Sequence, residues 1–324
     1  MSLKLTIKMA LMTLKVPRMW HNYEEDIQMS RETERVFREL HKAMEGKEFK
    51  SETEINDFMN EFMQTHNANV GKKKGNDAYD YLEMAQDTFD AKEAIRYAQK
   101  ALKLDPYCLD AELIIAQAKS KDMEELKKNM EKVIQKGEEQ LAQRNISKEE
   151  DAGSFYGLLE TRPYMRVRKE YLNLLITQGR YRHAICEAEE LIRLNENDNL
   201  GVRYILMALY SYFEDEYEAK ILFDKYPEDS AFMLLPLIAL YYKMENDKKM
   251  KSYIRKLKNK TPQLQEALEM FMDDADEDEM KEILHAPMYR PFSVEEVVLA
   301  FSEAMFLYMP MNGFLDRLYD EAIS

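Results

Sequence analysis

Residues 94–106 read Ala-Ile-Arg-Tyr-Ala-Gln-Lys-Ala-Leu-Lys-Leu-Asp-Pro, and they decide the fold class. The small residues Ala94, Ala98 and Ala101 recur at spacings of four and three, which places them on one face of a helix. Small side chains on one face let a second helix approach closely, and Pro106 ends the helix because proline has no amide hydrogen to donate. The stretch therefore predicts the second helix of a tightly packed helix pair.

The same register returns along the chain. Ala184 begins a second copy, Ala219 a third copy 35 residues later, and Met250 a last copy, which Pro262 closes at the spacing seen between Ala94 and Pro106. Another pair fits over 109–120 and 122–144, where Asp122-x-x-Glu125 is the pattern of a capping box. One helix pair cannot bury its apolar face alone, so these repeats predict a stack of about five pairs.

The chain is predicted to be all-α, a right-handed α-solenoid of helix hairpins with helical end caps. Its 324 residues include only 9 glycines and 9 prolines, too few for the turns that short strands need. The repeat array is expected over 75–264, interrupted by a loop over 145–160. An N-terminal helical cap over 1–66, a polar linker over 67–74 and a C-terminal helical cap over 265–324 flank the array. In the C-terminal cap, Ser293-x-x-Glu296 is the pattern of a capping box, and it is expected to open an apolar helix over 297–309. The first 20 residues fit a short strand or a helix.

The pattern from Ala94 to Pro106 resembles the second helix of a tetratricopeptide repeat. Two longer strings, Glu-Thr-Arg-Pro-Tyr-Met-Arg at 160–166 and Asn-Glu-Asn-Asp-Asn-Leu-Gly-Val-Arg-Tyr at 195–204, resemble tetratricopeptide proteins of the suppressor-of-tumorigenicity-seven group. The resemblance spans roughly residues 75–265. This chain has Glu196 where the group tends to have proline, and it lacks the membrane segments of the animal members. The resemblance implies a helical-repeat interaction protein with no settled reaction.

The same resemblance implies a concave groove lined by the first helix of each pair. The residues expected to contact a partner there are Arg166, Lys169, Asn173, Arg203 and Tyr204, with Ala208 and Ser211 farther along the same face. Lys169 and Asn173 match one part of the carboxylate clamp of some chaperone-binding repeats, but the later repeats offer no matching basic and amide groups. Two interpretations stay open. The cations bind an acidic segment of a partner, or Arg162, Arg166 and Arg203 pair internally with Glu160, Asp198 or Glu170.

No pattern of residues predicts chemistry. The five histidines form no His-Glu-x-x-His motif, and Gly71 to Gly75 lacks the Gly-Lys-Ser/Thr of a phosphate-binding loop. The acidic run at 273–279 has Glu279 where a calcium loop needs glycine. Cys108 and Cys186 are expected to be reduced and buried. The sequence therefore predicts no enzyme activity and no catalytic, cofactor-binding or metal-binding residue.

Charge and hydropathy narrow the function further. The net charge of −15 disfavours nucleic-acid partners, because phosphate backbones are repelled. The longest uncharged run, Ser230 to Tyr242, has 13 residues, whereas a membrane-spanning helix needs about 20. No signal peptide is recognisable. We expect a cytoplasmic, non-catalytic scaffold that binds a peptide or helix of another protein. The alternatives are a peptide-responsive cytoplasmic regulator and an enzyme with an isolated site, and the oligomeric state stays open.

Overall fold

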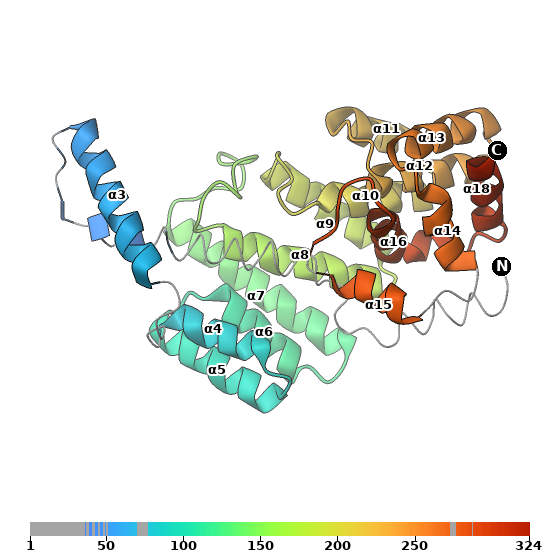
Figure 1. Cartoon of the computed structure of the whole chain (residues 1–324). Helices are drawn as coiled ribbons and strands as arrows, with labels where there is room; N and C mark the ends of the chain where they lie inside the picture. The colour runs from blue at the N-terminus through green and yellow to red at the C-terminus, as the bar shows by residue number, and fades with distance from the viewer. Residues whose placement is uncertain are drawn as a thin grey trace. The chain divides into compact units, whose positions relative to one another are not determined.

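The computed structural model of the chain describes residues 51–69, 77–272, 277–286 and 288–324, with scattered positions between 36 and 49. Every regular element within these residues is a helix, so the all-α prediction is confirmed (Figure 1). Among the described helices, none combines the length and the apolar character that a bilayer crossing requires. The predictions for the first 20 residues, for residues 70–74 of the linker and for residues 273–276 of the acidic run lie outside the described residues.

The chain forms two compact units that divide between Leu174 and Leu175, a boundary that falls inside helix α8 (Arg162–Thr177). The helices of the first unit that precede α8 are α3 (Glu52–Asn69), α4 (Ala78–Asp87), α5 (Ala91–Leu104), α6 (Leu109–Lys119) and α7 (Met123–Gln143). Those of the second unit that follow it are α9 (Tyr181–Leu194), α10 (Val202–Tyr212), α11 (Glu216–Lys225), α12 (Ala231–Lys243), α13 (Asp247–Lys260), α14 (Leu264–Met272), α15 (Glu277–His285), α16 (Val294–Glu303), α17 (Met305–Tyr308) and α18 (Phe314–Ile323).

Helices α4 to α7 of the first unit pack consecutively, and α4 also touches α6. Ala98 and Ala101 of α5 are fully buried, and Ala94 is nearly so, as the repeat register predicts. The expected fifth pair is present as α6 and α7. Asp122 caps α7 by accepting from the amide of Glu125 at 2.8 Å, while the Glu125 carboxylate accepts from the amide of Lys121. The first bond of the expected capping box is therefore present. In the second bond the donor is the amide of Lys121 instead of the amide of Asp122.

Helix α7 comes close to the start of α8 at a glycine that the sequence analysis did not single out. A Cβ on Gly137 would lie 2.7 Å from Cδ2 of Tyr164 and 3.0 Å from Cδ1 of Leu109. Real Cβ atoms do not approach other carbon atoms so closely, so only glycine fits here. The chain between α7 and α8 has no regular helix, as predicted for 145–160, although Phe155 within it is fully buried.

In the second unit, the first helices α10 and α12 pack on each other, and each packs on its own second helix, α11 or α13. The C-terminal helices complete the unit, because α16 and α17 lie on α12, and α18 lies on α13 and α14. Helix α12 is apolar on all sides, and its residues 231–241 are all buried. A helix without a polar face needs neighbours on every side, and the C-terminal helices supply them.

The turns between the two helices of a pair repeat one backbone structure. A residue in the left-handed conformation ends the first helix in three pairs: Gly179, Glu214 and Glu245, with φ of 68°, 58° and 54°. The following amide then donates to the carbonyl five residues earlier, from Arg180 to Leu175, from Asp215 to Tyr210 and from Asn246 to Tyr241. This is the Schellman arrangement of helix ends.

The second helices also end alike. Helices α5, α9, α11 and α13 each close on a residue with φ between −133° and −116° and ψ between 74° and 95°, whose amide donates to the carbonyl four residues earlier. These residues are Asp105, Asn195, Tyr226 and Thr261. Three of them lie 11 residues after Ala94, Ala184 and Met250, the positions that set the repeat register.

Two local predictions were wrong. The expected continuous helix over 297–309 breaks at Ala304, which has φ −108° and ψ 26°, and both pieces bury their apolar side chains separately. Cys186 is exposed rather than buried. It lies two residues after the buried Ala184. Side chains two positions apart in an α-helix point in directions about 200° apart, so Cys186 faces away from the alanine side of α9.

Candidate functional site

Arg166 lies in α8 and forms an ion pair with Asp110 of α6. Its Nε donates to Oδ1 at 3.0 Å and its Nη2 to Oδ2 at 2.6 Å, a two-point contact of guanidinium with carboxylate. Arg166 is 2% exposed and Asp110 is 4% exposed. The sequence did not predict Asp110 as a partner, because Asp110 is 56 positions away in the chain and only the fold brings it close.

Lys169 and Asn173 share a face of α8 with Arg166, three and seven residues along. Both are buried, at 4% and 5% exposure. The sequence predicts these three residues at the wall of an open groove, where a partner would reach them. Their burial in this structure opposes that role, and their contact with a partner stays a prediction.

Arg203 begins α10 within a compact arrangement of charges. Asp198 adopts the left-handed conformation with φ 48°, and its two carboxylate oxygens accept from the amides of Val202 at 2.7 Å and Arg203 at 2.9 Å. The Arg203 guanidinium pairs with Asp198 at 3.0 Å and with Glu228 at 2.9 Å. The internal pairing of Arg203 with Asp198, one of the two interpretations from the sequence, is therefore present. Burial raises the pKa of Asp198, and Arg203 opposes that rise.

Tyr204 completes this arrangement. The Arg203 guanidinium lies 4.1 Å from the centre of its ring, and its hydroxyl donates to Glu228 at 2.8 Å. The ring also packs against Phe232 of α12, with 5.0 Å between ring centres. Burial raises the pKa of the Tyr204 hydroxyl, so it stays a neutral donor. Arg203 and Tyr204 thus fasten the start of α10 to the segment between α11 and α12.

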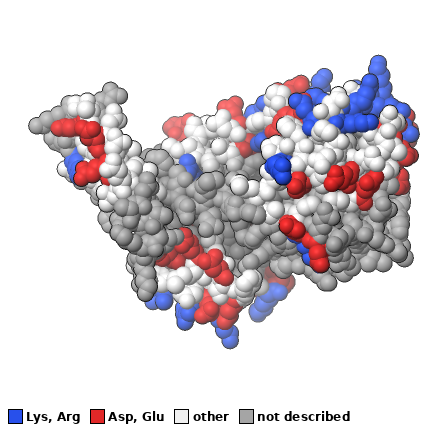
Figure 2. Space-filling model, viewed as in Figure 1, with Lys and Arg blue, Asp and Glu red and all other residues white. Residues whose placement is uncertain are grey.

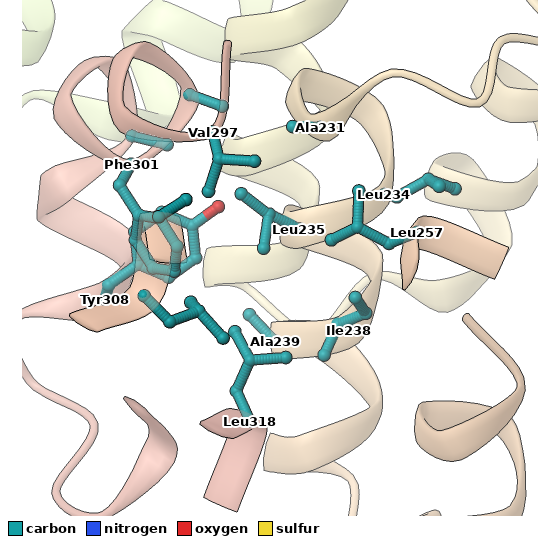
Figure 3. Close-up of a cluster of buried hydrophobic side chains, with 14 of the residues drawn as sticks. Ala231, Leu234, Leu235, Ile238, Ala239, Leu257, Val297, Phe301, Tyr308 and Leu318 are labelled. Carbon is teal, nitrogen blue, oxygen red and sulfur yellow. The ribbon is translucent and has the colours of Figure 1, made fainter. Parts of the chain in front are cut away.

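The remaining groove positions on α10 are part of the core. Ala208 and Ser211 are fully buried, and Ala208 belongs to the same apolar cluster as Val297 and Phe301 of α16. Figure 3 shows this cluster, in which side chains of α12 and α16 fill the space between the two helices. The expectation that Ala208 and Ser211 line an open surface was therefore wrong. The chain's own C-terminal helices cover the face that a partner was expected to occupy.

Glu296 of α16 joins two helices through its carboxylate, whereas the sequence predicts only a local capping role for it. It is buried, and its Oε1 accepts from the amide of Ala231 at the start of α12 at 2.5 Å. Its Oε2 accepts from the amide of Phe292 at 2.7 Å. The pattern Ser293-x-x-Glu296 marks the helix start correctly, since Ser293 accepts from the Glu296 amide, but no local signal predicts the bond to α12.

Among the described helices of the second unit, α11 and α13 present large exposed side chains. On α11, Tyr217 is 72% exposed and Ile221, one turn farther along, is 46% exposed. On α13, the outward positions carry lysine and arginine. Among the described residues, no group of three or more His, Cys, Asp or Glu side chains is arranged to hold a metal ion.

Comparison with known proteins gives no assignment: no protein-family model and no curated protein matches this sequence.

Proposed function

We propose that this chain is a non-catalytic protein-interaction scaffold, built from helix pairs of the tetratricopeptide type, which binds a peptide or helix of a partner protein in the cytoplasm. The repeated backbone geometry supports the repeat type. Schellman turns have their left-handed residue five positions before Ala184, Ala219 and Met250, and second-helix ends of one geometry lie 11 positions after Ala94, Ala184 and Met250. The two free thiols, Cys108 and Cys186, agree with a reducing compartment.

The observation that carries the binding function is the pair Tyr217 and Ile221. Two large apolar side chains at i and i+4 stand out from one face of α11, where a folded domain gains nothing from their exposure. Partner helices and peptides use apolar anchors at this spacing. Because α16 and α17 fill the face of α10 and α12, we place the partner on the outer face of α11 and α13 rather than in the concave groove.

Affinity purification from the native cell, followed by mass spectrometry, tests this proposal. The bait is the full chain, beside the double variant Tyr217→Ser/Ile221→Ser and a control variant Leu104→Ser/Met123→Ser, which removes two comparably exposed apolar side chains from the first unit. We expect a recurrent protein that the wild type and the control retain and the α11 variant loses. Equal recovery with all three baits, or no recurrent protein at all, contradicts the proposal.

A further inference from the structure

Helix α13 concentrates positive charge in an acidic protein. Its 14 residues contain seven Lys or Arg and one Asp, whereas the whole chain has 46 Lys and Arg in 324 residues and a net charge of −15. Figure 2 shows the resulting blue area in the upper right, where Figure 1 places α13. The inward face of the helix is apolar, with Met250, Ile254 and Leu257 buried. All seven cations therefore lie on the sides and on the outward face.

The cations on the two sides of α13 have partners within the unit. Lys249 pairs with Glu216 of α11, and Asp229 pairs with both Lys256 at 2.5 Å and Lys260 at 3.7 Å. On the other side, Lys251 pairs with Glu321 of α18 at 2.9 Å. These pairs join α13 to its neighbours, which is an ordinary structural use of lysine.

Three cations of α13 do not join it to a neighbouring element in the described part of the chain. Within the part of the chain that the structure describes, Lys248, Arg255 and Lys258 form no ion pair, and all three are exposed. Lys248 and Arg255 are seven residues apart, so they lie on the same outward face, about 10 Å apart along the helix axis. Among the described residues, Arg255 has a single hydrogen bond, which its Nε donates to the carbonyl of Lys251.

Helix stability does not explain this arrangement. Lys251 lies three residues after Lys248 and four before Arg255, and like charges at these spacings repel each other. Lys248 also lies in the first turn, where the helix dipole disfavours a cation. Only Lys258, in the last turn, has a favourable position relative to the dipole. A cation that weakens its own helix and has no internal partner calls for an external one.

We propose that the outward face of α13, centred on Lys248 and Arg255, binds an acidic segment of a partner protein. This inference rests on the proposed scaffold function and names the chemistry of the partner. The cationic face is opposite in charge to such a segment, which would be drawn to it through the otherwise repulsive field of the chain.

The surroundings of the face favour a narrow ligand over a phosphate surface. The face is one helix wide, about 10 Å. Carboxylates border it: Asp247 at the start of α13, Glu216 of α11, which pairs with Lys249, and Glu321 of α18, which pairs with Lys251. A membrane or a nucleic-acid duplex would bring its phosphates against these carboxylates, whereas a single acidic helix or strand lies between them.

Fluorescence anisotropy with a synthetic probe tests the proposal directly. The probe is a labelled helical peptide with glutamates at i, i+4 and i+7 on one face, and its control has glutamine at those positions. The proteins are the full chain, the variant Lys248→Glu/Arg255→Glu, and the control Lys128→Glu/Lys132→Glu, which makes the same change of charge on exposed positions of α7. Thermal melting checks the fold of each, and Lys248→Glu should not weaken α13, since an acidic residue suits its first turn.

We expect the glutamate probe to bind the wild type and the α7 control alike, and the α13 variant at least about tenfold more weakly. Binding should also fall as salt rises from about 50 mM to about 300 mM, since the face is exposed. Equal binding of the probe to all three proteins overturns the proposal, as does equal binding of the glutamine peptide. Tighter binding to vesicles containing phosphatidylserine, or to duplex DNA, with the same loss in the α13 variant, also overturns it and reassigns the face to phosphates.

Two further readouts separate this inference from the scaffold function. If affinity purification yields a partner that the α13 variant retains, the scaffold function stands and the α13 site fails. If no partner is recovered but the probe binds as expected, the scaffold function fails and the acidic-ligand site stands. Sedimentation of the protein alone completes the design: a dimer that the α13 variant abolishes would show that a second copy of the chain, rather than a partner protein, occupies the face.

Discussion

Arg166 and Asp110 form an ion pair that water hardly reaches, and this makes each dependent on the other. Removing two charges from water is costly, and their mutual two-point contact offsets that cost. Arg203 and Asp198 form a pair of a different kind. Arg203 is partly exposed, and Asp198 keeps two backbone amide donors whatever happens to the arginine. The two arginines should therefore respond differently to substitution.

We predict that Arg166→Ala lowers the free energy of unfolding by about 3–5 kcal/mol, because it leaves a buried carboxylate without its arginine. Arg203→Ala should cost less, about 1–3 kcal/mol, because Asp198 stays hydrogen-bonded. Urea denaturation of both variants measures the difference. Adding Asp110→Asn to Arg166→Ala should restore part of the loss, since the stranded charge is gone. An Arg166→Ala protein as stable as the wild type would refute the internal brace.

Tyr308 is a residue whose polar group has no visible purpose in the fold. It is buried within the apolar cluster of the second unit (Figure 3), and its hydroxyl has no hydrogen-bond partner among the described residues. Burial raises the pKa of this hydroxyl far above its ordinary value, so it stays neutral. A buried hydroxyl without a partner is destabilising.

Removal of that hydroxyl should therefore do no harm. We predict that Tyr308→Phe raises the free energy of unfolding by about 1 kcal/mol, because the ring packing is kept and the unpaired oxygen is lost. Thermal and urea melting measure the change. Tyr204→Phe is the matched control and should be destabilising, because its hydroxyl donates to Glu228. A clear loss of stability in Tyr308→Phe would show that its hydroxyl is bonded.

At the scale of the elements, the start of α12 shows how one helix depends on another. Ser230 occupies the N-cap position but makes no side-chain bond to the first turn. The carboxylate of Glu296, from α16, accepts from the Ala231 amide instead. An anion at a helix start is favoured by the unpaired amides and by the helix dipole, so this bond ties α16 to α12 at the point where α12 most needs an acceptor.

We predict that Glu296→Ala lowers the free energy of unfolding by about 1–3 kcal/mol, since it leaves the buried Ala231 amide unpaired. Glu296→Gln should lose less, because its amide oxygen still accepts one of the two bonds. Glu295→Ala, on the preceding and less buried position of α16, is the control and should change stability little. Denaturant titration decides among the three, and equal stability of Glu296→Ala and Glu295→Ala would contradict the cap.

The alanines of the second helices yield a packing prediction. Ala184 has no exposed surface, so Ala184→Leu should overpack the helix pair and cost about 1–3 kcal/mol. Ala94→Leu should also be destabilising, because Ala94 occupies the same register position in α5. Ala91→Leu, on an exposed position of α5, is the control and should be close to neutral. If both core variants melt at the wild-type temperature, the repeat register is wrong.

At the scale of the molecule, the C-terminal helices are part of the core of the second unit rather than a removable cover. Phe301 of α16 is almost fully buried, and its ring lies 4.9 Å from that of Phe271 and 4.7 Å from that of Tyr308. The same apolar cluster includes Leu235 and Ile238 of α12. A partner that entered this face would have to displace a close-packed core.

We predict that Phe301→Ala destabilises the second unit by about 3–5 kcal/mol, the usual cost of emptying a core position of this size. Ile323→Ala, at an exposed position of α18, should cost far less. Hydrogen exchange followed by mass spectrometry shows whether α12 loses protection together with α16, as one cooperative core requires. If α16 opens alone while α12 stays protected, the C-terminal helices are a separable cover.

The sequence by itself determined the helices and the turns between them. Helix period, small residues on one face and turn chemistry such as Gly179 all act over a few residues, so they can be read without knowing the fold. The same reason made three other features predictable: the helix pair α6 and α7, the loop over 145–160, and the ion pair of Arg203 with Asp198, which are five residues apart.

Only the tertiary structure decided which surfaces are exposed and which charged side chains form internal ion pairs. The sequence shows on which face of its helix Arg166 or Ala208 lies. It does not show that Asp110, 56 positions away, contacts Arg166, or that α16, about 90 positions away, packs against Ala208. The bond from Glu296 to Ala231 spans 65 positions and has no local pattern. Local patterns fix the direction of a side chain within its helix, whereas its partner depends on how distant helices pack, and packing is settled by the whole apolar core at once.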